Sequence, residues 1–213
     1  MAERFYIKSL EEDFFTKTLK AKEKVNFQSV YDMVKKRTIR LNTKSFGRKR
    51  RLSTTILSKN YLKTYRPQGI IFQTSNVPDY VLPFDLVLLS KTDKIVVHYY
   101  RIKNNLHAYY NHKLIEGFER FIFKDFDSMV KKFRSPNAVW IEVNKFRKDS
   151  GYETLPRQKY RLVEYNEAVF HKPVKIVPIA IFGYRKDTSN IARRCGLPHY
   201  VSAKDFWKKT QKD

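Results

Sequence analysis

Short runs of alternating, β-branched residues place the strongest constraint on the fold of this 213-residue chain. Such runs are typical of half-buried strands, and here several follow one another with few helical segments between them. Successive strands favour an antiparallel sheet, whereas strict alternation of strands with helices favours a parallel one. We expect strands at residues 51–57, 70–74, 81–89, 94–101, 118–123, 160–165 and 174–182.

Capping residues and apolar spacing predict helices beside these strands. Ser9-Leu-Glu-Glu12 is a capping box ahead of apolar residues at helical spacing. Ser135 can cap a helix in which Pro136 takes the first position. We expect helices at residues 10–24, 27–36, 125–133, 135–148, 189–195 and 203–210. The sequence therefore predicts a single α+β domain over residues 1–213, with a curved, mostly antiparallel sheet flanked by helices.

The composition indicates a folded chain outside the membrane. Hydrophobic residues make up 42% and aromatic residues 15%, enough to bury a core. No apolar run approaches the roughly 20 residues of a membrane span, and the N-terminus does not resemble a signal peptide. The single cysteine, Cys195, forms neither an internal disulfide nor a cysteine-rich zinc site. We expect a cytoplasmic protein that does not bind membranes.

The distribution of charge indicates the partner. The formal net charge is +23, and no acidic residue occurs between Asp32 and Asp79. A solvated surface usually mixes charges of both signs, whereas a run of cations repels itself unless a polyanion neutralises it. We therefore expect nucleic acid to bind here. The predicted DNA-binding residues are Arg37, Arg40, Lys44, Arg48, Lys49, Arg50, Arg51, Lys63 and Arg66.

The spacing of possible metal ligands gives little support to metal chemistry. Restriction-type nucleases hold Mg²⁺ with an Asp and a following Glu-x-Lys, but Glu142-Val-Asn-Lys145 has one residue too many and falls in a predicted helix. Zinc-ligand spacing is absent around His98, His107, His112, His171 and His199. We predict no metal and no cofactor. A metal-dependent endonuclease and a non-enzymatic basic RNA- or DNA-binding protein remain alternatives.

Two segments hold candidate site residues. Residues 60–67 place Tyr61 and Tyr65 among cations, where a ring could stack on an extruded base or bond to its edge. Ser202-Ala-Lys-Asp205 is a capping box. A carboxylate at a helix N-terminus is kept ionised, which suits a group that faces a developing cation. Both segments also have purely structural interpretations, a tyrosine in the core and a helix cap.

Four stretches of the chain resemble the PabI-type restriction DNA glycosylases. They are residues 50–65, 81–89, 94–100 and 163–174, and the likeness lies in length, charge and β organisation over residues 45–207. The resemblance implies a homodimer with a strongly curved half-pipe sheet that recognises a short palindrome of the GTAC type. It also implies that the protein flips adenine out of double-stranded DNA and excises it without a metal, leaving abasic sites that are then nicked.

The resemblance also implies site residues. The family uses a Tyr and an Asp near the two ends of the chain, with basic residues around the pocket. These correspond here to Tyr65 or Tyr61 and to Asp205, with Arg40 and Lys145 as supporting cations. Asp205 would stabilise the cationic sugar or orient the attacking water, and Tyr65 would hold the base.

One position departs from the family pattern. The family has a His three residues before its catalytic Asp, whereas Ser202 stands three residues before Asp205 here. The nearest imidazole in this part of the chain belongs to His199. We therefore include Ser202 and His199 among the candidate catalytic residues, because either the alignment with the family is displaced here or the role of the histidine has moved.

Overall fold

The computed structural model describes residues 4–10, 28–41, 52–91, 98–102, 106–110 and 114–211. The strands are β1 (Tyr6–Ser9), β2 (Thr38–Ile39), β3 (Leu52–Ile56), β4 (Gly69–Gln73), β5 (Tyr80–Leu82), β6 (His98–Ile102), β7 (Leu106–Tyr110), β8 (Glu167–Phe170), β9 (Val174–Lys175), β10 (Val177–Phe182) and β11 (His199–Tyr200). The α-helices are α2 (Val30–Lys36), α3 (Phe126–Lys132), α4 (Pro136–Asp149), α5 (Lys186–Cys195) and α6 (Ala203–Thr210), and the 3-10 helices are η1 (Leu86–Leu89), η2 (Phe118–Phe121) and η3 (Arg157–Val163).

A seven-stranded sheet in the order β11-β10-β4-β1-β3-β8-β5 organises the fold. Its neighbouring strands are antiparallel except β10 and β11, which are parallel. The pairs β2–β9 and β6–β7 form separate two-stranded sheets. The prediction of an α+β fold with a mostly antiparallel sheet is therefore confirmed.

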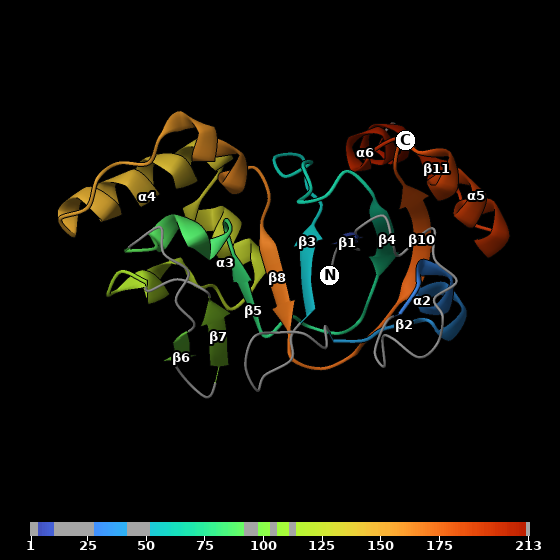
Figure 1. Ribbon diagram of the computed structural model, residues 1–213, viewed down its shortest axis with the longest axis horizontal. Helices are drawn as coiled ribbons and strands as arrows, with labels where there is room; N and C mark the ends of the chain where they lie inside the picture. The colour runs from blue at the N-terminus through green and yellow to red at the C-terminus, as the bar shows by residue number, and fades with distance from the viewer. Residues whose placement is uncertain are drawn as a thin grey trace.

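The helices gather at the two edges of the sheet (Figure 1). Helices α3 and α4 lie toward the β5 edge, whereas α2, α5 and α6 lie toward the β10–β11 edge. The helices pack on the sheet through three apolar clusters. One cluster joins α4 and the 3-10 helices to β5 and β8, another joins α2, α3 and α5 to the central strands, and a third lies between the sheet and α6.

Local capping residues position the helices: the caps at Ser135 and Ser202 are as predicted, whereas Ser29 caps α2, which begins three residues after the predicted start at residue 27. The hydroxyls of Ser29, Ser135 and Ser202, and the carboxylate of Asp125, each accept a hydrogen bond from a backbone N–H of the first turn. Helix α5 begins at Lys186, three residues before the predicted start. The helix predicted at residues 10–24 lies almost entirely outside the described residues.

Two predicted strands are wrong. Residues 118–123 and 160–165 fall mainly in the 3-10 helices η2 and η3. In η2 the buried Phe118 and Phe121 are three residues apart, and in η3 Tyr160 and Val163 have the same spacing. Residues three apart share one face of a 3-10 helix, so this geometry places each pair together on the same core.

The other predicted strands are confirmed to differing extents. Strands β3 and β4 match the predictions at 51–57 and 70–74. The run at 81–89 is a strand only through Leu82, because Pro83 provides no N–H for a strand ladder and η1 follows. The run at 174–182 divides into β9 and β10. Of the run at 94–101, residues 98–101 are described and lie in β6.

Candidate nucleic-acid groove

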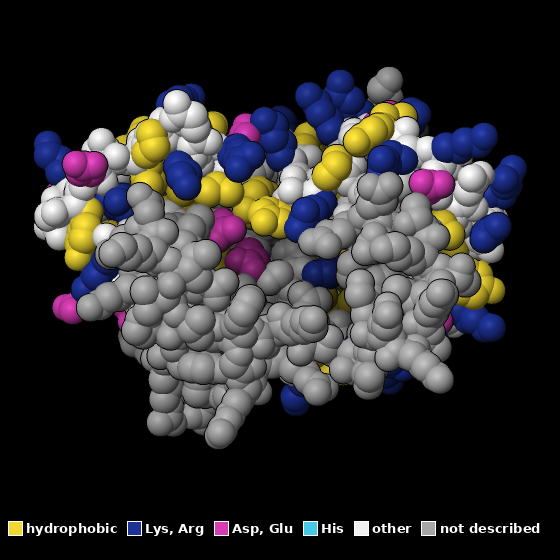
Figure 2. Space-filling model, viewed as in Figure 1, with side chains coloured by type: hydrophobic (Ala, Val, Ile, Leu, Met, Phe, Trp, Pro, Cys, Tyr) yellow, Lys and Arg dark blue, Asp and Glu magenta, His cyan; other side chains and the backbone are white. Residues whose placement is uncertain are grey.

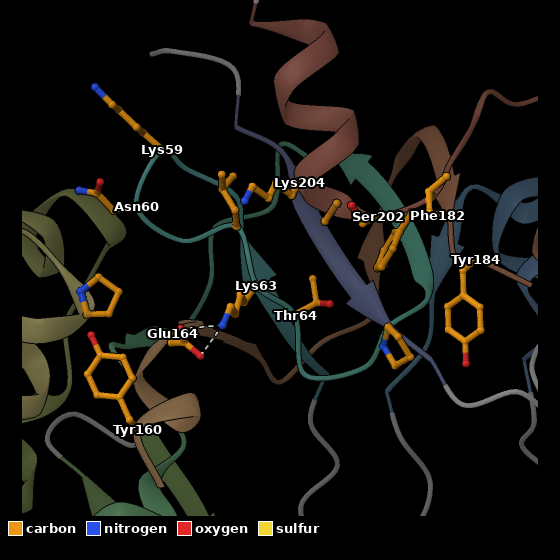
Figure 3. Close-up of a pocket in the computed structure, with 15 residues that line it drawn as sticks. Lys59, Asn60, Lys63, Thr64, Tyr160, Glu164, Phe182, Tyr184, Ser202 and Lys204 are labelled. Atoms are coloured by element: carbon orange, nitrogen blue, oxygen red, sulfur yellow. Dashed lines mark hydrogen bonds and ion pairs between the residues drawn. The ribbon is translucent and has the colours of Figure 1, made fainter. Parts of the chain in front are cut away.

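A groove of about 660 Å³ crosses one end of the sheet; we call it the central groove (Figure 3). It is lined by Lys59, Asn60, Leu62, Lys63, Thr64, Pro67, Pro136, Tyr160, Glu164, Phe182, Tyr184, Val201, Ser202, Ala203 and Lys204. These residues come from the β3–β4 connection, from the start of α4 with η3, and from the end of β10 with the start of α6. The fold thus brings the two predicted site segments, 60–67 and 202–205, to one groove.

Hydrogen bonding and charge connect the walls of the central groove. The Asn60 side-chain amide donates a hydrogen bond to the Arg134 carbonyl at 2.7 Å. The Lys63 ammonium lies 2.7 Å from one carboxylate oxygen of Glu164 and 2.8 Å from the other. These contacts fix the β3–β4 connection against the segments around α4 and η3.

Positive charge exceeds negative charge along the central groove. Three lysines line it, Lys59, Lys63 and Lys204, against one acidic side chain, that of Glu164. In the same view as Figure 1, Lys and Arg side chains stand on both sides of the upper rim with hydrophobic side chains between them (Figure 2). A concave surface with this charge attracts a polyanion, and its lysines can neutralise phosphates.

Exposed apolar and aromatic side chains accompany these cations. Tyr184 is 68% exposed and Val201 is 60% exposed, and both line the central groove. Tyr160 contributes a ring held from two sides, because the Arg157 guanidinium lies 4.0 Å from its centroid and the Trp140 ring meets it edge-on. Bases stack on exposed aromatic rings whatever their sequence. The groove therefore offers surfaces for bases as well as for phosphates.

Tyr65, the first of the two predicted tyrosines, lies next to the residues that line the central groove. It is 59% exposed, and the Arg66 guanidinium lies 5.1 Å from its ring centroid. Its ring meets that of Tyr165 edge-on, and the Tyr165 hydroxyl donates to the Asp85 carboxylate at 3.3 Å. Burial and the Asp85 charge raise the pKa of Tyr165, so this supporting residue stays neutral. Of the two predicted tyrosines, Tyr65 is therefore the one that a ligand can reach.

Tyr61, the second predicted tyrosine, lies in the core. Its side chain is fully buried, its ring meets Phe126 edge-on, and burial raises its pKa to about 12. Among the described residues its hydroxyl has no hydrogen-bond partner. The structure therefore separates two tyrosines that the sequence left as alternatives.

We expect Tyr61→Phe to raise the free energy of unfolding by about 1 kcal/mol, because a buried hydroxyl without a partner costs about 1–3 kcal/mol. The substitution removes the oxygen and keeps the ring against Phe126. Urea unfolding followed by circular dichroism measures the change. Destabilisation by more than about 1 kcal/mol would contradict the absence of a partner for this hydroxyl. Weaker DNA binding by a fully folded Tyr61→Phe would contradict a purely structural Tyr61.

Asp205 and Ser202 form the predicted helix cap at the start of α6. The Ser202 hydroxyl accepts from the Asp205 backbone N–H at 3.1 Å, and the Asp205 carboxylate accepts from the Val201 N–H at 3.4 Å. The Lys209 ammonium lies 3.4 Å from the same carboxylate. Ser202 lines the central groove, whereas Asp205 is not among the described residues that line it. The cap holds Asp205 beside the groove, one residue beyond Lys204.

His199 joins the end of the sheet to α5. Its Nε2 lies 2.8 Å from the Gly183 carbonyl oxygen and 3.1 Å from the Thr188 hydroxyl. The short contact with a carbonyl indicates that Nε2 carries the proton and donates it to Gly183. His199 is half-buried in β11 and does not line the described groove.

Of the predicted basic residues that the structure describes, Lys63 alone lines the central groove. Lys145 is exposed on α4 and does not line it. Arg37 and Arg40 flank β2, which pairs with β9 at the start of β10, whereas Phe182 at the end of β10 lines the groove. Lys63 lines the groove and Arg66 contacts Tyr65. The other predicted DNA-binding residues, Lys44, Arg48, Lys49, Arg50 and Arg51, lie outside the described residues.

Sequence reasoning missed groove residues, above all Glu164, Tyr160 and Tyr184. Glu164 and Tyr160 fall in a segment that we expected to be a strand, whereas Tyr160 lies in η3 and Glu164 directly follows this 3-10 helix. The signal that could have found them is the spacing of three between Tyr160 and Val163, which fits a 3-10 helix. Tyr184 directly follows Gly183 at the end of β10, a position typical of an exposed turn residue.

Among the residues that the structure describes, no group of three or more His, Cys, Asp or Glu side chains is arranged to hold a metal ion. None of the helices described is both long and apolar enough to cross a bilayer. Comparison of the chain with known protein families, with curated proteins and with solved structures finds no match.

Proposed function

We propose that the protein is a DNA glycosylase that binds double-stranded DNA across the central groove and excises adenine from a short palindrome. The observation that carries the proposal is the groove itself, which combines three lysines and one carboxylate with the exposed ring of Tyr184 and the half-buried ring of Tyr160. Lysines neutralise phosphates, and exposed rings receive a base that has left the duplex. The chemistry and the GTAC-type site follow from the resemblance to PabI-type enzymes.

In this proposal Tyr65 and Asp205 have different tasks. Tyr65 holds the extruded base, since its ring is exposed beside the groove and supported by Arg66 and Tyr165. Asp205 faces the positive charge that develops on the deoxyribose as the N-glycosidic bond breaks. Its place in the first turn of α6 holds the carboxylate on a fixed element.

The proposal extends to assembly and location. A homodimer would match the two-fold symmetry of a palindromic site, and a half-pipe sheet would give the duplex a curved surface along which to lie. Double-stranded DNA in the cytoplasm would be the substrate. These features rest on the resemblance and on the sequence rather than on contacts within the chain.

Incubation with plasmid DNA in EDTA, followed by alkali, tests the proposed function. We expect discrete fragments after alkali and free adenine in the supernatant, because base hydrolysis needs no metal and abasic sites are alkali-labile. Fragments that form only when Mg²⁺ is supplied, without free adenine, would indicate a phosphodiesterase instead. Tight DNA binding with neither product would indicate a binding protein.

A non-enzymatic nucleic-acid-binding protein is the second candidate, and one observation favours it. Ser202, Asp205 and His199 each have a structural partner: the first two cap α6, and His199 bonds to Gly183. These contacts would be sufficient to explain all three residues in a protein that only binds. The plasmid experiment separates this candidate from the glycosylase.

A further inference from the structure

We propose that Glu164 is the general base of the central groove, the carboxylate that takes a proton from the attacking water. This assignment rests on the proposed glycosylase function and adds to it a residue that neither the sequence signals nor the resemblance pointed to. Among the residues that line the described groove, Glu164 is the one acidic side chain. A hydrolytic site in this groove therefore has one lining carboxylate available as a base.

The setting of Glu164 supports this role. The residue directly follows η3, and its side chain is 22% exposed, so the carboxylate is partly shielded and still open to the groove. The Lys63 ammonium contacts both carboxylate oxygens (Figure 3). Lys63 is itself 68% exposed, so an entering phosphate can compete for it. Binding of DNA would then leave the Glu164 carboxylate free to accept a proton.

The chemical step balances without a metal or a redox partner. The oxygen of one water molecule bonds to C1′ of the deoxyribose while the bond between C1′ and the adenine nitrogen breaks. The electron pair of that bond leaves with adenine, which takes a proton from solvent. Glu164 accepts the proton that the water loses and later returns it to solvent, so one water is consumed for each adenine released.

Glu164→Gln tests the assignment, because the amide keeps the shape of the side chain and removes its basicity. We expect single-turnover adenine release to fall by about 100-fold or more, as general-base catalysis contributes about 10²–10⁴-fold, while DNA affinity changes less than about threefold. In Glu164→Ala, added formate should restore part of the lost rate, since a small carboxylate can occupy the vacated space. A structural ion pair would not give this rescue.

Glu142→Gln is the matched control. Glu142 forms an ion pair with Arg120 at 2.9 Å, its side chain is 27% exposed, and it does not line the central groove. We expect this variant to release adenine at the wild-type rate. Three results would each overturn the assignment. Glu164→Gln could release adenine at the wild-type rate, or Glu142→Gln could lose as much of that rate as Glu164→Gln. Formate could also fail to restore adenine release in Glu164→Ala while the melting temperature of that variant is lowered. No release by the unaltered protein would overturn the proposed function and the assignment together.

Discussion

Asp205→Asn should lower adenine excision by about 100-fold or more while DNA binding stays within about threefold of wild type. Asparagine keeps an oxygen for the Val201 N–H that Asp205 now bonds, so the start of α6 should persist. What disappears is the negative charge that we propose faces the deoxyribose cation, and removal of one such stabilising group typically costs about 10²–10³-fold in rate. Single-turnover release of adenine, measured beside a binding titration, gives both quantities.

Asp187→Asn provides the control for a purely electrostatic effect on a helix. Asp187 is exposed in the first turn of α5, as Asp205 stands in the first turn of α6. Both variants should lose about 0.3–1 kcal/mol of stability through the weakened interaction with the helix dipole, and only Asp205→Asn should lose excision. Near-normal excision by Asp205→Asn would restrict this residue to capping.

Gly69→Ala should cause the largest loss of stability among substitutions at the glycines of the described chain. A Cβ at Gly69 would lie 2.2 Å from the carbonyl oxygen of Lys8 and 3.0 Å from the ring of Phe182. Lys8 belongs to β1 and Phe182 to β10, the two strands that flank β4 in the sheet. Because a backbone atom of a central strand cannot move aside alone, we expect a loss of about 3 kcal/mol or more.

Gly151→Ala separates this clash from the general effect of adding a methyl group. Gly151 has a φ of +79°, and no atom lies within 4 Å of the position that its Cβ would take. Only the backbone conformation then opposes the substitution, at about 1–2 kcal/mol. Guanidinium unfolding should give Gly69→Ala a much lower free energy of unfolding than Gly151→Ala. Equal free energies of unfolding would contradict the close approach of β1 to β4.

Local signals account for the parts of the fold that were predicted correctly. Ser135 and Pro136 fix the start of α4 through groups within one turn of the helix, and Asp125 does the same for α3. The runs at 51–57 and 70–74 alternate in the manner of strands and became β3 and β4. In each of these cases, residues close together in the sequence make the interaction or the pattern that determines the element.

Central strands β1 and β8 show why other parts of the sheet were missed. Strand β1 occupies the space between β3 and β4, and β8 the space between β3 and β5. Each is four residues long and too short for a clear alternating pattern. Their conformation depends on partners far away in the sequence, as between Ser53 and Val169 in β3 and β8. Non-local pairing of this kind leaves little trace in a single short segment.

The sequence by itself determined the excess of positive charge, the starts of α3, α4 and α6, and the α+β class, because composition, caps and periodicity act locally. Only the tertiary structure decided which residues meet in the central groove. Lys63 and Glu164 are 101 positions apart and lie 2.7 Å from each other, and burial removed Tyr61 from the surface while leaving Tyr65 exposed. Those outcomes depend on how the strands are ordered in the sheet, and strand order is set by long-range packing that no local pattern encodes.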